Sequence, residues 1–144
     1  MAKHRDTSIG ADLIKGAVAG AAATWIMGLA TTWMYERESQ QARDREEQAR
    51  GGRSPSTAMH WAIGIGAGAL YAGARRRWPT VARQMGLRFG SGLFVVADEV
   101  MNPALGFTPG PKAFPWQAHA RGLGGHLTYG MVTELVLEGL DAIA

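Results

Sequence analysis

An uncharged run of 20 residues, GAVAGAAATWIMGLATTWMY, occupies positions 16–35 of this chain. A helix needs about 20 predominantly apolar residues to cross the hydrocarbon layer of a membrane, and this run has that length. A second run, at 54–74, contains His60 as its only ionisable group. These two runs predict membrane helices, with spans at about 14–35 and 57–74.

Two further apolar segments contain ionisable residues. Segment 81–101 includes Arg88 and ends near Asp98 and Glu99, whereas segment 118–140 includes His126 and Glu134. With the first two runs, they predict an all-α fold, an integral membrane bundle of four transmembrane helices that forms a single domain over 1–144. The chain has no cysteine, so disulfides and thiolate metal sites are excluded.

The segment ERESQQARDREEQAR, at 36–50, is charged and contains only fair or good helix formers. Its charges include oppositely charged residues four apart, such as Glu46 and Arg50, which can pair on one helix face. We therefore expect the first helix to continue beyond the membrane until Gly51 and Gly52 end it. This extension is either a solvated helix or an arm that docks onto a partner chain.

The net charge of +3 is unevenly distributed, with basic residues next to apolar spans. Such a pattern raises the pI without indicating nucleic-acid binding. The cluster Arg75-Arg76-Arg77 directly follows a span, which favours a cytoplasmic location for both chain termini. The basic residues are otherwise divided evenly, with Lys3, Arg5, Lys15, Arg75, Arg76, Arg77 and Arg83 on one side and Arg37, Arg43, Arg45, Arg50, Arg53, Lys112 and Arg121 on the other.

Glycines recur four residues apart in three of the predicted spans. In lipid, helices gain little from hydrophobic exclusion, so close backbone contact must supply the attraction. Small residues on one helix face permit that approach, and we expect a tight bundle. The pairs are Gly16 and Gly20, Gly64 and Gly68, and Gly86 and Gly90.

Ionisable residues inside the spans are the candidate functional positions. A charge in lipid costs at least about 2.5–3.5 kcal/mol, so these groups should face one another or a wet cavity. Adjacent residues on a helix point in different directions, so only one of Asp98 and Glu99 is expected to face inward. His119 and His126 are seven apart and share a face of the last span. The candidate polar cluster comprises His60, Arg88, Asp98, Glu99, His126 and Glu134.

This cluster admits several interpretations. It is a set of structural pairs that fix helix register, such as an acid with Arg88, or a proton-responsive cluster, because histidine titrates near neutrality. A metal site built from His126, His119 and an acid is a further alternative, although no His-x-x-x-His pair supports it. There is no nucleophile–base motif and no phosphate loop, so we expect neither catalysis nor a cofactor nor a small-molecule substrate.

The loop at 102–116 is rich in proline and glycine and separates the last two spans. Pro103 is expected to end the third helix, because the residue before proline is pushed out of helical conformation. Apolar side chains such as Phe107 and Phe114 favour a position on the membrane surface or among helix ends. We expect a rigid cap over the mouth of the bundle, with Asp98 and Glu99 beneath it. The cap is either a tight interfacial connection or a gate or ligand cover.

Segment 99–134 resembles the C-terminal half of the YagU-like family of small bacterial inner-membrane proteins. The resemblance is carried by "ALGFTP" after a proline, by "FPW", by "GGHLTYG" with a glutamate eight residues after its histidine, and by "MHWAIGIGAGALYAG" upstream. It implies an integral inner-membrane protein of poorly defined function, loosely associated with acid tolerance, without enzyme activity or cofactor. The matching positions are His60, Pro103, Gly106, Thr108, Pro109, Pro115, His126 and Glu134.

Three functional hypotheses follow. The first is a multi-pass inner-membrane protein, embedded in the lipid bilayer as a homo-oligomer, with a structural or proton-related role in acid stress. The second is an accessory subunit that packs against a larger membrane complex through segment 36–50. The third is a soluble or peripheral helical protein, suggested by a mean hydropathy of −0.08 and by the two weaker spans.

Overall fold

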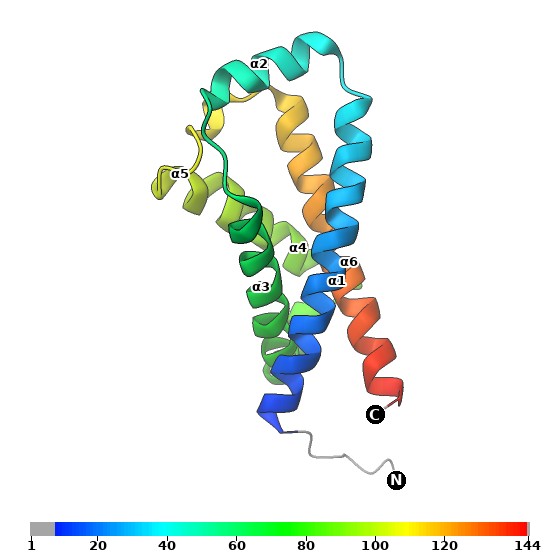
Figure 1. The fold of residues 1–144 in the computed structure, drawn as a ribbon. Helices are drawn as coiled ribbons and strands as arrows, with labels where there is room; N and C mark the ends of the chain where they lie inside the picture. Colours follow the sequence, from blue (N-terminus) through cyan, green and yellow to red (C-terminus); the bar gives the residue numbers. More distant parts are fainter. Residues whose placement is uncertain (1–7, 144) are drawn as a thin grey trace.

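The computed structural model describes residues 8–143, and every regular element in them is helical (Figure 1). The all-α prediction is therefore confirmed. Lys3 and Arg5, which enter the orientation argument, lie outside the described residues. The elements are α1 (Ile9–Glu36), α2 (Gln40–Arg50), α3 (Thr57–Arg77), the 3-10 turn η1 (Pro79–Ala82), α4 (Leu87–Leu93), the π-helical η2 (Phe94–Met101), α5 (Asn102–Ala104), the 3-10 turn η3 (Pro111–Ala113) and α6 (Trp116–Ile143).

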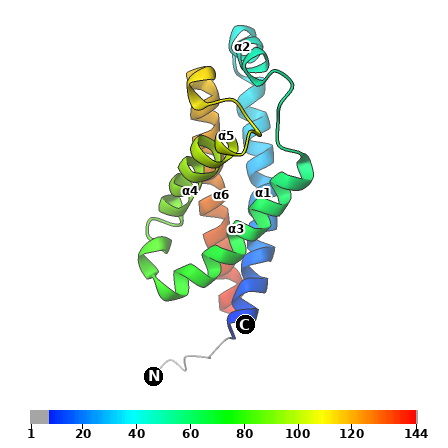
Figure 2. The same ribbon diagram turned by 90° about the vertical axis from the view of Figure 1, so that its left-hand side faces the viewer.

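The bundle is built around α1, which packs against both α3 and α6 (Figures 1 and 2). α1 and α6 run antiparallel, so Ile9 and Ile143 lie at one end of the bundle. α4 packs on α6, and the helix that continues it through η2 and α5 diverges toward the other end. α2 lies across that second end, above the loop that precedes α6.

Glycines bring the helix backbones into direct contact. A Cβ atom added to Gly68 would lie 2.4 Å from the carbonyl oxygen of Gly16, and one added to Gly20 would lie 2.5 Å from that of Gly64. The remaining pair contacts α6, because a Cβ on Gly90 would lie 2.2 Å from the carbonyl oxygen of His126 and one on Gly86 would meet Gly130. All three predicted glycine pairs therefore lie at helix contacts.

Many large apolar residues lie on the outside of the bundle, whereas the core combines small residues with a few large ones. Ala19, Ala23 and Tyr71 are fully buried, whereas Trp25 is 60% exposed and Leu70 is 71% exposed. Large exposed apolar side chains in this number suit a surface that faces lipid or a partner. Among the described residues, α1 is the helix with both the length and the apolar composition to cross a membrane.

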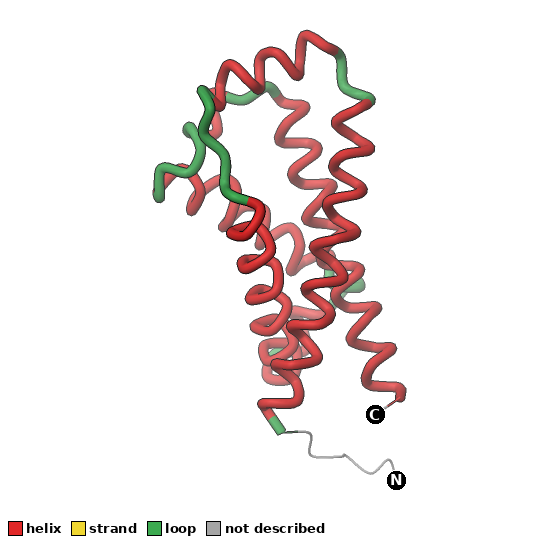
Figure 3. The backbone as a smooth tube through the Cα atoms, in the orientation of Figure 1, coloured by secondary structure: helices red, strands yellow, loops and turns green. Residues whose placement is uncertain are grey.

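The predicted extension of the first helix is wrong. α1 ends at Glu36 and α2 is a separate helix that turns back over the bundle (Figure 3). The N–H of Arg37 closes α1 on the carbonyl oxygens of Met34 and Tyr35, and the Ser39 hydroxyl accepts a hydrogen bond from the N–H of Ala42 to start α2. A serine N-cap satisfies a free N–H of a helix start and so favours a break at this point.

The third predicted span is also wrong at both ends. Its helix begins at Leu87 rather than 81, because Gln84, Met85 and Gly86 take left-handed conformations with φ of 60°, 53° and 75°. It then continues past Pro103 to Ala104. The segment before Asn102, η2, is π-helical, and the N–H of Asn102 donates to the carbonyl oxygen of Ala97 five residues back. This wider helix accommodates a proline that an α-helix interior would exclude.

The other three predicted spans agree with the helices observed. The predicted span at 57–74 lies within α3, and that at 118–140 lies within α6. α1 contains the predicted span at 14–35.

Candidate functional site

A cavity of about 250 Å³ lies beneath the loop at 102–116. Asp98 and Glu99 line it from η2, and Thr108, Pro109 and Pro111 line it from the loop. His119, Arg121, Arg50 and His60 line it from α6, α2 and the start of α3, and α1 also contributes to the wall. The structure thus places the loop over the two acids, with basic and imidazole groups on the opposite wall.

Residues of the loop motif have different positions. Thr108 and Pro109 line the cavity, and Gly106, with φ of 76°, forms the turn after α5. Pro103 lies in α5. Pro115 precedes α6 and lies in a shallow groove between the loop and α2. Only part of the motif therefore contributes to the cavity wall.

Both acids of the adjacent pair face α6, where one was expected to face inward. Glu99 Oε1 lies 2.6 Å from His119 Nδ1, and Asp98 Oδ2 lies 3.6 Å from His126 Nδ1. The two histidines are seven residues apart, about 10 Å along α6. That separation lets carboxylates that diverge from neighbouring positions of η2 each reach a different histidine.

His119 joins η2 to the loop through both nitrogens of its ring. Nδ1 contacts the carboxylate of Glu99, and Nε2 lies 3.0 Å from the carbonyl oxygen of Pro111. A neutral imidazole has one N–H, whereas a carbonyl and an ionised carboxylate only accept hydrogen bonds. Both contacts are therefore satisfied only when the His119–Glu99 pair holds two protons, as imidazolium with carboxylate or as neutral imidazole with a carboxylic acid.

His126 is buried, 6% exposed, and its ring orientation is fixed by its own helix. Its Nδ1–H donates to the carbonyl oxygen of Gly122 at 2.9 Å. The exposed His60 and the partly exposed Asp98 line a smaller cavity of about 90 Å³ with His126. His60, Asp98, Glu99 and His126 therefore gather at the same end of the bundle.

Arg88 and Glu134 do not join this group. Gly86 and Gly90 face α6, so Arg88, which lies between them, points to the other side of α4, where it is exposed and contacts Gln84 at 3.4 Å. Within residues 8–143, Arg88 forms no ion pair with an acid, so the alternative in which such a pair fixes helix register has no support there. Glu134 lies about two turns beyond His126 and belongs to a separate buried contact.

That contact joins α3 to α6. Glu134 accepts a hydrogen bond of 2.5 Å from the Tyr71 hydroxyl and lies 3.6 Å from Arg75 Nη1. Tyr71 is fully buried and Glu134 is 5% exposed. Because a buried charge must be paired and hydrogen-bonded, this contact fixes how α3 and α6 pack.

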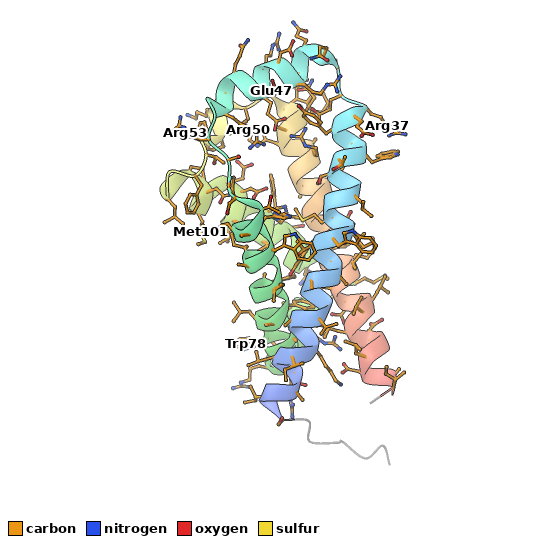
Figure 4. All side chains as sticks on the ribbon, in the orientation of Figure 1. Arg37, Glu47, Arg50, Arg53, Trp78 and Met101 are labelled. Atoms are coloured by element: carbon orange, nitrogen blue, oxygen red, sulfur yellow. The ribbon has the colours of Figure 1, made fainter. Side chains whose placement is uncertain are left out.

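An ion-pair network centred on Arg121 was missed by the sequence interpretation. Arg121 donates to Glu38 and, at 2.5 Å, to Glu46, which also accepts from Arg50 at 2.6 Å. Its guanidinium lies 4.9 Å from the ring centroid of Tyr35. The sequence pattern identifies Arg121 only as a charge that flanks a span, and no local spacing links it to Glu46 and Glu38, which lie 75 and 83 positions away. Figure 4 shows Arg50 on α2 at this end of the bundle.

Glu46 is 3% exposed, and its ionisation is set by these partners. Burial raises the pKa of its carboxyl, but the hydrogen bonds and charges of Arg121 and Arg50 together outweigh burial and hold the pKa below its ordinary value. Glu46 is thus the anion through which α2 docks on Arg121 of α6.

No group of three or more metal-ligating side chains is present within residues 8–143.

Residues 41–135 match a family described as a protein of unknown function, DUF1440. The chain belongs to the DUF1440 family. The match begins in α2 and includes the cavity, the loop and both histidines of α6. No curated protein matches the chain. No solved structure matches it either.

Proposed function

We propose that this DUF1440 protein is a multi-pass protein of the bacterial inner membrane, of the YagU-like type, with a proton-dependent latch on its loop. The observation that carries the proposal is the contact of both His119 ring nitrogens with acceptors, one on η2 and one on the loop. The latch gives the protein a means of responding to acid.

The distribution of side chains supports membrane embedding. Gly, Ala and Thr form the helix contacts, and Trp, Leu, Ile and Val cover the outside of the bundle. That arrangement suits helices that associate in lipid through close packing. Trp33 and Trp78 are 56% and 59% exposed near opposite ends of the bundle, as aromatic residues at two membrane interfaces would be.

The latch depends on the number of hydrogen-bond donors that the His119–Glu99 pair has for its two contacts. When the His119–Glu99 pair holds two protons, the loop is bonded through Pro111 and Glu99 is bonded as well. Loss of one proton leaves a single N–H for two acceptors, so one contact breaks and the loop loosens as the pH rises. The charged and titratable groups around the pair are Asp98 on η2, Arg50 on α2, Arg121 on α6 and His60 on α3.

A spin label on Thr108→Cys, in a chain without native cysteine, reports loop mobility in lipid vesicles. We expect low mobility at acidic pH and higher mobility at alkaline pH. His119→Ala should make the loop mobile at every pH. The matched control is His60→Ala, which removes a histidine of the same cavity that does not contact the loop carbonyl. A pH profile that His119→Ala leaves unchanged rejects the latch.

A second candidate is an accessory subunit of a larger membrane complex. It is favoured by the outward face of α2, where Gln41, Asp44, Arg45 and Gln48 are exposed, and by the groove that this helix forms with the loop. Reversal of one charge, in Arg45→Glu, leaves the inward Glu46 contacts intact. It should abolish copurification of a partner from membranes, and an unchanged set of copurifying proteins counts against this role.

A further inference from the structure

The turn between η1 and α4 presents Arg83 beside the middle of α6. A Cβ on Gly86 would lie 2.2 Å from the carbonyl oxygen of Gly130, which stands midway between Trp116 and Ile143. Arg83 lies three residues before this point, whereas Arg88 points to the other side of α4. Arg83 is exposed and forms no ion pair with any residue from 8 to 143.

The backbone of this turn is also open. Gln84 and Met85 have left-handed conformations, and neither N–H donates a backbone hydrogen bond within the part of the chain described. Irregular backbone does not face lipid within the hydrocarbon region, because its polar groups have no partner there. An exposed arginine at such a depth is also costly to place in lipid. In a membrane, this face must therefore be covered.

We propose that a second copy of this chain covers the α4–α6 face. This inference rests on the proposed membrane embedding. Glu138 lies one turn beyond Glu134, whose Cβ is 3.3 Å from the position of a Cβ on Gly86, and is exposed without an ion pair in residues 8–143. The same face thus carries one cation, Arg83, and one anion, Glu138, that have no ion-pair partner within residues 8–143. A two-fold axis brings the Glu138 of each copy to the partner's Arg83.

The rest of the face suits contact between two copies. Met85 is 52% exposed and Leu135 is 47% exposed. Exposed apolar side chains of this kind allow a second helix to pack on the face. The Arg83–Glu138 pairs then lie at the edges of an apolar contact and set its register.

Energy transfer between donor- and acceptor-labelled copies in lipid vesicles tests the proposal, with labels on Gln48→Cys, away from the face. We expect transfer above that of randomly distributed monomers. Arg83→Glu and Glu138→Arg should each weaken dimerisation by at least about tenfold, and the double variant should restore it. The control Arg53→Glu makes the same charge change on an exposed loop residue and should leave dimerisation unchanged.

Random-level transfer for the unaltered chain overturns the proposal, as does a dimer insensitive to both charge reversals. Copurification of a different protein that Arg83→Glu releases also overturns it, in favour of an accessory-subunit role. Retention of all variants in carbonate-washed membranes is measured in parallel. Release of the unaltered chain would refute membrane embedding and the dimer together, whereas retention without dimerisation would refute the dimer alone.

Discussion

The contact between α1 and α3 gives the sharpest prediction, through the substitution Gly68→Ala. The added methyl group would lie 2.4 Å from the carbonyl oxygen of Gly16 and 2.5 Å from the Cα of Gly20, both backbone atoms. Ordinary contact begins at 3.4 Å, so the two helices must separate by about 1 Å at this point (3.4 − 2.4). Overpacking of this kind costs about 1–3 kcal/mol.

Alanine also has an intrinsic advantage over glycine in a helix of about 0.8–1.0 kcal/mol. The net expectation for Gly68→Ala is therefore a loss of about 1–2 kcal/mol in the free energy of unfolding. Gly66→Ala is the matched control on the same helix, because a Cβ there meets nothing within 4 Å. It retains only the helical advantage and should not destabilise the protein.

Denaturant titration in a mild detergent, followed by helical circular dichroism, measures both variants against the unaltered chain. The reasoning requires opposite signs, with Gly68→Ala less stable and Gly66→Ala equal or more stable. Equal effects of the two substitutions would refute the claim that backbone contact at Gly68 holds α1 and α3 together.

Three further predictions concern buried polar contacts between the helices. Glu46→Gln should lower the free energy of unfolding by about 1–3 kcal/mol, because Arg121 loses a charged acceptor; Asp44→Asn, an exposed change on the same helix, should have little effect. The pKa of Glu46 is lower in the folded state than its ordinary 4.5, so its contribution to the stability of the folded chain is present above pH 4.5 and is lost as the pH falls further. A spin label at position 48 on α2 should therefore become mobile below that pH. This transition should be absent in Glu46→Gln. Tyr71→Phe should lower the free energy of unfolding, measured by thermal unfolding, by about 1–3 kcal/mol, because Glu134 loses a buried hydrogen-bond donor. In the control Tyr35→Phe, the lost hydroxyl makes only an exposed contact of 3.5 Å, so the free energy of unfolding should change by less than about 0.5 kcal/mol. Comparable losses in the two variants would contradict this account.

Local sequence pattern predicted the helices and the contacts that depend on one face of a helix. The glycine pairs of α1 and α3 could be recognised because a spacing of four residues places both members on the same side. The lengths of α3 and α6 followed from their apolar runs in the same way. Serine caps are short-range signals too, and Ser39 could have indicated the break between α1 and α2.

Contacts between segments far apart in the chain could not be predicted from the local sequence pattern. Arg121 reaches Glu38 and Glu46 only because α2 folds back across the bundle, which no periodicity records. The outward position of Arg88 depends on which face of α4 meets α6. Asp98 and Glu99 each lie close to a histidine, because η2 is π-helical and α6 has two histidines two turns apart.

The most direct test of membrane embedding is the sidedness of two single cysteines, introduced in a chain that has none. Gln48→Cys lies on α2 and Arg77→Cys lies at the end of α3, both exposed, at opposite ends of the bundle. In sealed inner-membrane vesicles of either orientation, an impermeant thiol reagent should label position 77 from the cytoplasmic face only and position 48 from the opposite face only. Labelling of both positions from the same face, or recovery of the chain in the soluble fraction, would contradict the account.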